Sequence, residues 1–239
     1  MTNQAFLDYF YNQLNKVRTL QGPGYDPLEI SLFASEAQEL LVLTKYNPSS
    51  NTTKEGFEET EKRLQDIGNL VQNALIIPGA NIPENMPNGV FVDLPNTLLI
   101  DPTDYSNVFW LTIFEQAVTS QLDCTNNPLR VNIYEINHGE YAELLKDPFN
   151  KPSKERIWRM RVGNNRHELI TDGTYSISGY HVRYIRKPRP IDLTGLATTS
   201  VSELADITHR ELVRKTVELV LDDTENRTRI AIEASKRKE

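Results

Sequence analysis

Apolar residues at the start of the chain recur with the spacing of an amphipathic helix. The residues in this pattern are Phe6, Phe10, Leu14 and Val17. Intervals of four, four and three residues place these side chains on one face of a helix. The pattern therefore predicts a helix over residues 3–18, with one face turned toward a core.

A second helix is predicted after the break at residues 21–24. Asp26 precedes Pro27, and Glu29 follows three residues after Asp26. This order is typical of a capping box with proline in the first helical turn. We expect this helix to run to about Tyr46.

The apolar pattern changes in the middle of the chain. Helical spacing predicts a third helix over residues 57–73, after which prolines and glycines between residues 77 and 95 exclude a long helix. Short runs rich in β-branched and aromatic residues follow, at residues 97–100, 108–118, 130–136, 157–162 and 175–185. These runs predict a mostly antiparallel β region, with a short helix within residues 138–146.

Helical spacing returns near the end of the chain, after a polar connector at residues 194–202. The apolar residues that carry it are Leu204, Ile207, Leu212, Val213, Val217, Val220 and Leu221. The predicted fold class is therefore α+β, a helical bundle formed by the N- and C-terminal helices with an inserted, mostly antiparallel β region. We expect three parts: a helical part at 1–75, the β region with its Pro-rich opening at 76–203, and a helical part at 204–239.

Composition and charge narrow the function. The chain of 239 residues has a formal net charge of −7, which argues against a protein whose main role is to coat nucleic acid. Cys124 is the single cysteine, so no disulfide can form within the chain. No apolar run approaches the roughly 20 residues of a membrane span, which predicts a soluble protein with no membrane partner.

Signatures of catalysis and of ligand binding are missing from the sequence. It contains no phosphate-binding glycine pattern, no nucleophile elbow and no zinc-binding helix motif. The four histidines, His138, His167, His181 and His209, are scattered along the chain. We therefore expect no catalytic residue, no cofactor and no metal site, and a protein that is not an enzyme.

Basic residues are concentrated in one stretch of the β region. Residues 154–189 hold nine basic and three acidic side chains, whereas residues 1–75 hold six basic and ten acidic ones. Strand alternation predicts that Trp158, Met160 and Val162 share one face and that Arg159 and Arg161 share the other. The candidates for an interface or a DNA channel are Arg159, Arg161, Arg183, Arg186, Lys187 and Arg189. Such a set can pair with an acidic protein, contact DNA, or form a solvated sheet face, and we favour the protein interface.

Two sets of residues resemble one family of phage proteins. Near the start these are FLDYFYN at 6–12, PGYD at 23–26, EIS at 29–31, AQ at 37–38, GFE at 56–58 and TEKR at 60–63. Near the end they are YIRKPRPIDL at 184–193, EL at 203–204, and a helix through His209 and ELV at 211–213. Together they cover about half the chain. They resemble virion structural proteins that form the head-to-tail connector rings, or adaptors, of crAss-like podovirus bacteriophages.

The resemblance implies a structural role without catalysis. It implies a homo-oligomeric ring, a dodecamer, at the portal vertex or tail connector of the virion, made in the cytoplasm of the bacterial host. As a portal–tail adaptor or gatekeeper, such a ring would attach the tail, retain the DNA and let it pass during genome ejection. Its implied partners are the portal protein, other connector or tail proteins and, transiently, genomic DNA. The alternative is a phage-encoded nucleic-acid-binding module that uses the basic β region.

Overall fold

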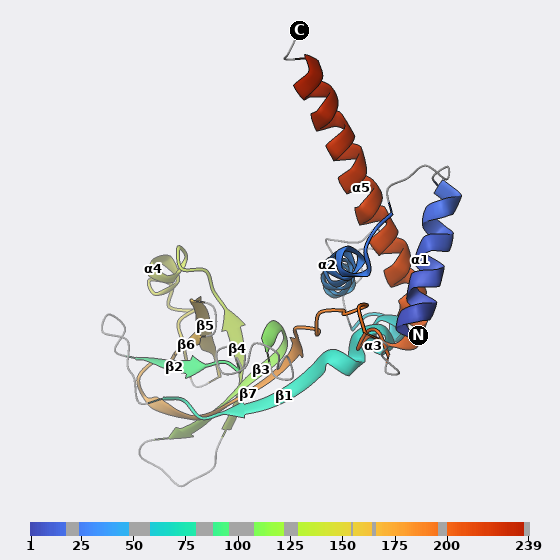
Figure 1. The fold of residues 1–239 in the computed structure, drawn as a ribbon. Helices are drawn as coiled ribbons and strands as arrows, with labels where there is room; N and C mark the ends of the chain where they lie inside the picture. The colour runs from blue at the N-terminus through green and yellow to red at the C-terminus, as the bar shows by residue number, and fades with distance from the viewer. Residues whose placement is uncertain are drawn as a thin grey trace. The chain divides into compact units, whose positions relative to one another are not determined.

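The chain divides into two compact units. A computed structural model describes residues 1–17, 24–47, 58–79, 88–95, 108–121, 129–153, 155–163, 166–195 and 200–236. The contacts of the chain group Met1–Leu70 with Pro188–Glu239, and separately Val71–Lys187. We call the first the helical unit and the second the sheet unit (Figure 1). The three-part division predicted from the sequence stays a prediction beside these two units.

Four α-helices and two 3-10 turns make up the described helical segments of the helical unit. They are α1 (Asn3–Val17), α2 (Pro27–Tyr46), α3 (Glu61–Ile67) with the 3-10 turn Gly68–Leu70, and α5 (His209–Lys236), which the 3-10 turn Asp206–Thr208 precedes. The predicted start of α2 is confirmed, because the backbone N–H of Asp26 donates to Glu29 Oε2 at 3.2 Å. This bond satisfies one of the donors that the first turn of a helix leaves unpaired.

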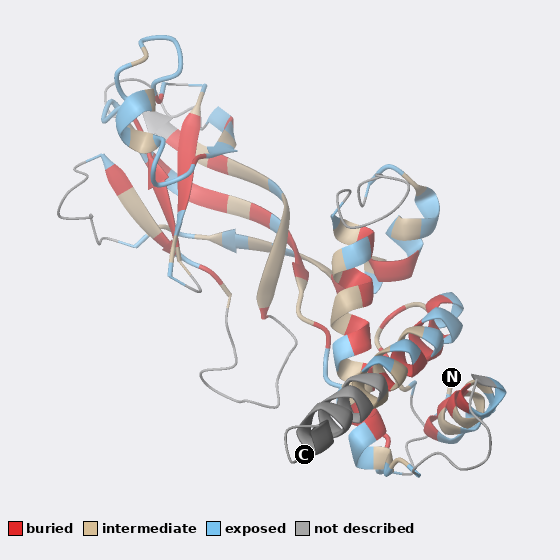
Figure 2. Cartoon of the chain, turned by 90° about the horizontal axis from the view of Figure 1, so that it is seen from above, coloured by how far each residue is buried: buried red, intermediate tan, exposed pale blue. Residues whose placement is uncertain are grey.

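The core of the helical unit joins three helices and an extended segment. Its buried residues are Phe6, Phe10 and Leu14 of α1, Ile30, Ala34 and Ala37 of α2, Leu212, Val213, Val217 and Val220 of α5, and Ile191 and Leu193. Figure 2 shows this buried face along the helices. The first and last thirds of the chain thus bury their apolar stripes against each other, which offsets the marginal stability of short helices in isolation.

Extended chain, and not a helix, completes this core. The backbone N–H of Ile191 donates to Ser35 Oγ, and that of Leu193 donates to Ser31 Oγ, both at 2.9 Å. Gln38 Nε2 donates to the carbonyl oxygen of Arg189 at 2.8 Å. Side chains of α2 therefore satisfy the backbone of a segment that has no strand partner.

The predicted fold class is wrong. The chain is a mixed α+β protein with a curled seven-stranded sheet among its described residues, and not a helical bundle with an inserted β region. Apolar spacing shows that each helix has a buried stripe, but it does not show what covers the stripe. In the helical unit, part of that cover is the extended segment at residues 189–193, so the helices do not close a regular bundle on their own.

The third predicted helix ends too late. Phe57, its predicted start, lies outside the described residues, and α3 ends at Ile67. The strand β1 (Val71–Ile76) then pairs with β7 over its whole length. Ile67 and Val71 are four residues apart and so imitate one turn of a helix, but tertiary pairing overrides that local pattern.

The sheet unit has seven described strands in the order β1-β7-β3-β4-β5-β6-β2. After β1 they are β2 (Gly89–Asp93), β3 (Phe109–Gln121), β4 (Leu129–Glu135), β5 (Ile157–Val162), β6 (Arg166–Ile170) and β7 (Tyr175–Arg186). β4 and β5 pair in parallel, and the other neighbours pair antiparallel.

The runs predicted as strands at 108–118, 130–136, 157–162 and 175–185 are confirmed as β3, β4, β5 and β7. The run at 97–100 lies outside the described residues, and β2 and β6 were not predicted.

The two faces of the sheet unit differ along its length. The inner face holds a core to which β2, β3, β4, β5, β6 and β7 all contribute, including Tyr180, Val182 and Tyr184. Behind β5, Trp158 and Met160 pack with Tyr141 and Leu144 of the short helix α4 (Tyr141–Leu144). Trp158 and Met160 thus share a face as predicted. Both faces of β5 are consequently covered from Ile157 to Met160, so Arg159 is buried, whereas Arg161 lies beyond this stretch and is exposed.

Candidate protein interface and buried charge networks

Five polar side chains from five strands meet inside the sheet unit. Arg159 of β5 lies 3.0 Å from Glu115 Oε1 of β3 through its Nε, and 2.6 Å from Glu135 Oε2 of β4 through Nη2. Its Nη1 lies 3.2 Å from Nε2 of His167 on β6. His167 Nδ1 lies 2.9 Å from the Tyr180 hydroxyl of β7. That hydroxyl donates to Glu115 Oε2 at 2.9 Å, which closes a cycle back to Glu115.

The direction of these hydrogen bonds fixes the state of His167. An arginine can only donate, so His167 Nε2 accepts from Arg159 and the imidazole proton lies on Nδ1, from which it is donated to Tyr180. Burial, and then the charges of Arg159 and Arg161, lower the pKa of His167 to about 3. The ring is therefore neutral at physiological pH, and both of its nitrogens are engaged.

The two oxygen acids of the cycle are shifted in the opposite sense. Burial raises the pKa of Glu115, although Arg159 and the hydrogen bond from Tyr180 oppose that shift. Burial and the nearby Glu115 raise the pKa of Tyr180. Because every group binds another member of the cycle, we assign the cycle a structural role. It clamps β3, β5, β6 and β7 together inside the curl.

A smaller charge cluster lies in the helical unit. Lys45 Nζ of α2 donates to Asp66 Oδ2 of α3 at 2.6 Å and to Glu211 Oε2 of α5 at 2.9 Å. The Asp66 side chain is fully buried, whereas that of Glu211 is half exposed. The cluster ties together three helices that are far apart in the sequence.

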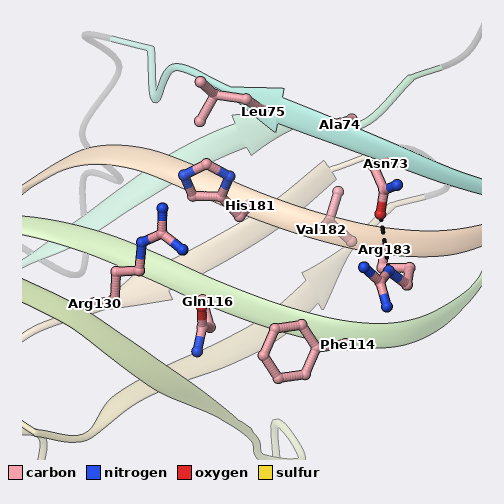
Figure 3. Close-up of a pocket in the computed structure, with 9 residues that line it drawn as sticks. All are labelled: Asn73, Ala74, Leu75, Phe114, Gln116, Arg130, His181, Val182 and Arg183. Atoms are coloured by element: carbon pink, nitrogen blue, oxygen red, sulfur yellow. Dashed lines mark hydrogen bonds between the residues drawn. The ribbon is translucent and has the colours of Figure 1, made fainter.

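The outer face of the sheet unit is open and carries a shallow groove (Figure 3). The groove has a volume of about 320 Å³ and is lined by Asn73, Ala74, Leu75, Phe114, Gln116, Arg130, His181, Val182 and Arg183, none of them acidic. Leu75 is 62% exposed and Phe114 is 48% exposed. Large apolar side chains that remain exposed beside cations are typical of a protein interface.

The predicted basic residues do not form one row. Arg159 is buried in the polar cycle, while Arg161 on the same strand is exposed. Arg183 lies in the groove, where its Nε donates to Asn73 Oδ1 at 2.9 Å. Arg186 is the last residue of β7 and Lys187 follows it, and both are half-buried. Arg189 is exposed in the helical unit. The structure thus brings one candidate into the groove, and their role as interface or channel residues stays a prediction.

The sequence pattern missed most of the groove. Its lining comes from β1, β3, β4 and β7, and β7 pairs with β1 and β3, which are both far from it in the chain. Alternation along β1 exposes Asn73 and Leu75 while Ala74 packs on the core. Such alternation is typical of a strand with one open face. The helical spacing of Ile67 and Val71 nevertheless led to the prediction of a helix over these residues.

Two kinds of site are absent from the part of the chain that the structure describes. That part holds no cluster of three or more His, Cys, Asp or Glu side chains suited to a metal ion. None of its helices combines the length and the apolar character needed to cross a membrane.

Comparison with known proteins points to phage rings. The model of the phage tail ring protein 3/4 family matches residues 1–238. The chain is 26% identical over 254 aligned positions to ring protein 4/5 of Bacteroides phage crAss001, and the alignment covers all of both chains. It is also 26% identical over 233 positions to ring protein 3 of the same phage, covering 92% of this chain and 95% of the relative. The predicted resemblance to crAss-like phage ring proteins is confirmed: the chain belongs to the phage tail ring protein 3/4 family.

Proposed function

We propose that this protein forms a ring in the connector between the head and the tail of a crAss-like phage. There it acts as a portal–tail adaptor or gatekeeper that attaches the tail, retains the DNA and lets it pass. We further propose that the ring is a dodecamer and that its neighbours are the portal protein and other connector or tail proteins. The family match and the names of the two relatives support a ring component of the virion.

The open outer face of the sheet unit is the observation that carries this proposal. Leu75 and Phe114 expose apolar surface, and no described part of their own unit covers it. In a ring, each copy presents one patch to the copy on its left and a different patch to the copy on its right. A face that stays uncovered in the single chain is suited to one of those two contacts.

We infer that the protein has no turnover of its own. In the cycle, both nitrogens of His167 are engaged, and Arg159 meets two carboxylates. Arg159, Glu115 and Glu135 also line an open pocket of about 430 Å³, but there the charge of the arginine is already paired with the two carboxylates. Purified protein should therefore hydrolyse no nucleotide, nucleic acid or glycan.

Nucleic-acid binding is the second candidate, and one observation favours it. The groove combines Arg130, His181 and Arg183 with no acidic residue, as a surface that contacts phosphates would. The exposed apolar side chains in the same groove favour a protein partner instead. A gel-shift assay at physiological salt separates the two: we expect no shift with the genomic DNA.

Mass spectrometry of purified particles and a symmetry-resolved image of the portal vertex test the proposal. We expect the chain in the particle as one ring with twelvefold symmetry, adjoining the portal or another connector ring. If the chain occurs only in infected cells and never in particles, the ring proposal fails and nucleic-acid binding takes its place.

A further inference from the structure

The solvent face of α2 complements the groove on the outer sheet face. Leu28 and Leu32, one turn apart on α2, are 58% and 69% exposed. Asp26, Glu29 and Glu36 are exposed on the same stretch. From residue 24 to residue 44 the sequence contains no lysine or arginine. This face is therefore apolar and acidic, whereas the groove is apolar and basic.

The two exposed apolar side chains of the groove flank one strand. Leu75 of β1 lies opposite His181 of β7, and Phe114 of β3 lies opposite Arg183 of β7. The two apolar side chains thus stand on either side of β7, two strand spacings or about 10 Å apart across the sheet and offset by two residues along it. A helix with its side chains has a diameter of about 10–12 Å, so a helix that runs along β7 can rest on His181 and Arg183 and reach Leu75 and Phe114 at its two sides. Figure 3 shows all four side chains.

These matches lead us to propose that α2 of one copy docks in the groove of the next copy. Leu28 and Leu32 pack against Leu75 and Phe114, while the carboxylates of α2 face Arg130 and Arg183. The docking partner is thus a second copy of this chain, bound through two different surfaces. Such a contact is head-to-tail and closes into a ring when the rotation between copies allows it. The inference rests on the proposed ring, for which it names the contact.

Charge supports this pairing over the two alternatives. Groove against groove would bring Arg130 and Arg183 of two copies together, and α2 against α2 would bring carboxylates together. Like charges across an interface suppress such pairings, whereas unlike charges fix partner and register. The charge pattern therefore favours the head-to-tail contact over a closed pair of two copies.

Disulfide crosslinking between variants tests the contact directly. In a Cys124→Ser background, Leu32→Cys and Leu75→Cys are made in separate chains, mixed and oxidised. Both positions are exposed, so neither change removes a core contact. We expect a crosslinked pair in the mixture. The matched control replaces Leu75→Cys by Phe149→Cys, which is 89% exposed in the sheet unit and lies outside the groove, and should give no crosslink.

The double variant Leu32→Cys, Leu75→Cys distinguishes contact between copies from contact within one copy. Head-to-tail contact gives a ladder of oligomers that ends in a covalent ring. If α2 instead occupies the groove of its own chain, the double variant gives only a crosslinked monomer and the mixture gives nothing. That result would overturn the proposal.

Reversal of charge gives an independent test. Glu36→Arg or Arg183→Glu alone should weaken the association of copies by roughly tenfold, and the two together should restore much of it. If the wild-type protein forms rings, but the cysteine variants do not crosslink and the charge reversals do not change the association of copies, this contact is overturned. The proposed ring function would then still stand. If the purified chain stays monomeric, the same variants are measured in assembled particles, where a missing crosslink overturns the contact. Absence of the wild-type chain from particles would instead contradict the proposed function itself.

Discussion

Each unit of this protein buries one cation between two carboxylates, but the two clusters are built differently. In the helical unit, Lys45 meets the buried Asp66 and the half-exposed Glu211. In the sheet unit, Arg159 meets the buried Glu115 and the exposed Glu135, and it also donates to His167. The cation is the hub in both cases, yet only the arginine continues into a cycle of further hydrogen bonds.

The difference follows from the chemistry of the two cations. A lysine ammonium is a compact charge whose donors diverge from one atom, and it can gather carboxylates from two other helices around one point. An arginine guanidinium is a planar fork with five donors, so it reaches partners on several strands at once. Arg159 connects β5 to β3, β4 and β6 in this way. We infer that the sheet unit depends on its cation more than the helical unit does.

Replacement of Arg159 should have the largest effect on stability and tests whether the sheet unit depends more strongly on its cation. Arg159→Met should lower the free energy of unfolding of the sheet unit by about 3–5 kcal/mol, because it leaves the buried Glu115 without its cation. Trp110 and Trp158 are the two tryptophans of the chain, and both lie in the sheet unit. Tryptophan fluorescence during urea unfolding therefore measures this unit.

Two further variants sharpen the Arg159 experiment. Arg159→Lys keeps the charge but loses the fork, so it should fall between wild type and Arg159→Met. Arg183→Met removes an exposed arginine of the same sheet and should change the free energy of unfolding by less than about 0.5 kcal/mol. An effect of Arg159→Met as small as that of Arg183→Met would contradict the structural role of the cycle.

Replacement of Lys45 should have a smaller effect, confined to the helical unit. Lys45→Met leaves Asp66 buried without a cation and should cost about 2–3 kcal/mol. Circular dichroism at the helix minimum follows this unit, which contains every long helix in the described chain. The control Lys215→Met removes an exposed lysine that pairs with Glu218 on α5 at 2.8 Å, and it should be near neutral. A shift in the fluorescence transition as large as that in the circular dichroism would show that the two units unfold together.

The same two clusters show what the sequence could and could not predict. Helical spacing located α1, α2 and α5 because each buries one stripe, and the stripe of Phe6, Phe10 and Leu14 is buried as expected. Alternation in β5 correctly separated Trp158 from Arg159. It could not show which face is covered, because parity divides a strand into two faces without saying what packs on either. Arg159 was therefore expected in an interface and lies in the core.

The groove was beyond the reach of local pattern. Leu75, Phe114 and His181 come from three strands, and their proximity depends on the pairing of β1 and β3 with β7. Nothing in the spacing of one run encodes which other run it pairs with. The resemblance to ring proteins supplied the class of function, whereas only the fold showed the surface suited to it.

Lowering the pH should destabilise each unit through the histidine that it buries, His167 in the sheet unit and His209 in the helical unit. Folding lowers the pKa of His167 from 6.5 to about 3, so the unfolded chain binds a proton that the folded chain excludes. Stability is therefore lost as pH falls below the unfolded value, by about 2 kcal/mol between about pH 7 and about pH 5. Glu115 acts in the opposite sense, because its raised pKa favours the folded state as pH falls.

Replacement of each histidine isolates its contribution to this pH dependence. His167→Gln should flatten the loss of the fluorescence-detected stability toward low pH. Burial also lowers the pKa of His209 in the helical unit, so His209→Gln should flatten the loss detected by circular dichroism instead. Urea unfolding of wild type and both variants at a series of pH values measures these slopes. An unchanged fluorescence slope in His167→Gln would show that His167 is not the group that titrates.

The smallest predicted loss of stability concerns the neutral hydrogen bonds that hold the extended segment at residues 189–193 on α2. These bonds carry no charge, unlike the clusters around Lys45 and Arg159. Ser31 Oγ accepts from the buried N–H of Leu193 and donates to the carbonyl oxygen of Pro27 at 2.7 Å. Ser31→Ala should therefore cost the helical unit about 1–2 kcal/mol, because the Leu193 N–H loses its acceptor where water cannot replace it. Ser35→Ala removes the equivalent acceptor of Ile191 and should cost less, since that bond is only partly buried. The exposed Thr44→Ala, on the same helix, is the control and should stay within about 0.5 kcal/mol. Circular dichroism during urea unfolding gives the free energy of unfolding of the three variants. If Thr44→Ala loses as much stability as Ser31→Ala, helix propensity explains the effect, and the anchoring of residues 189–193 does not.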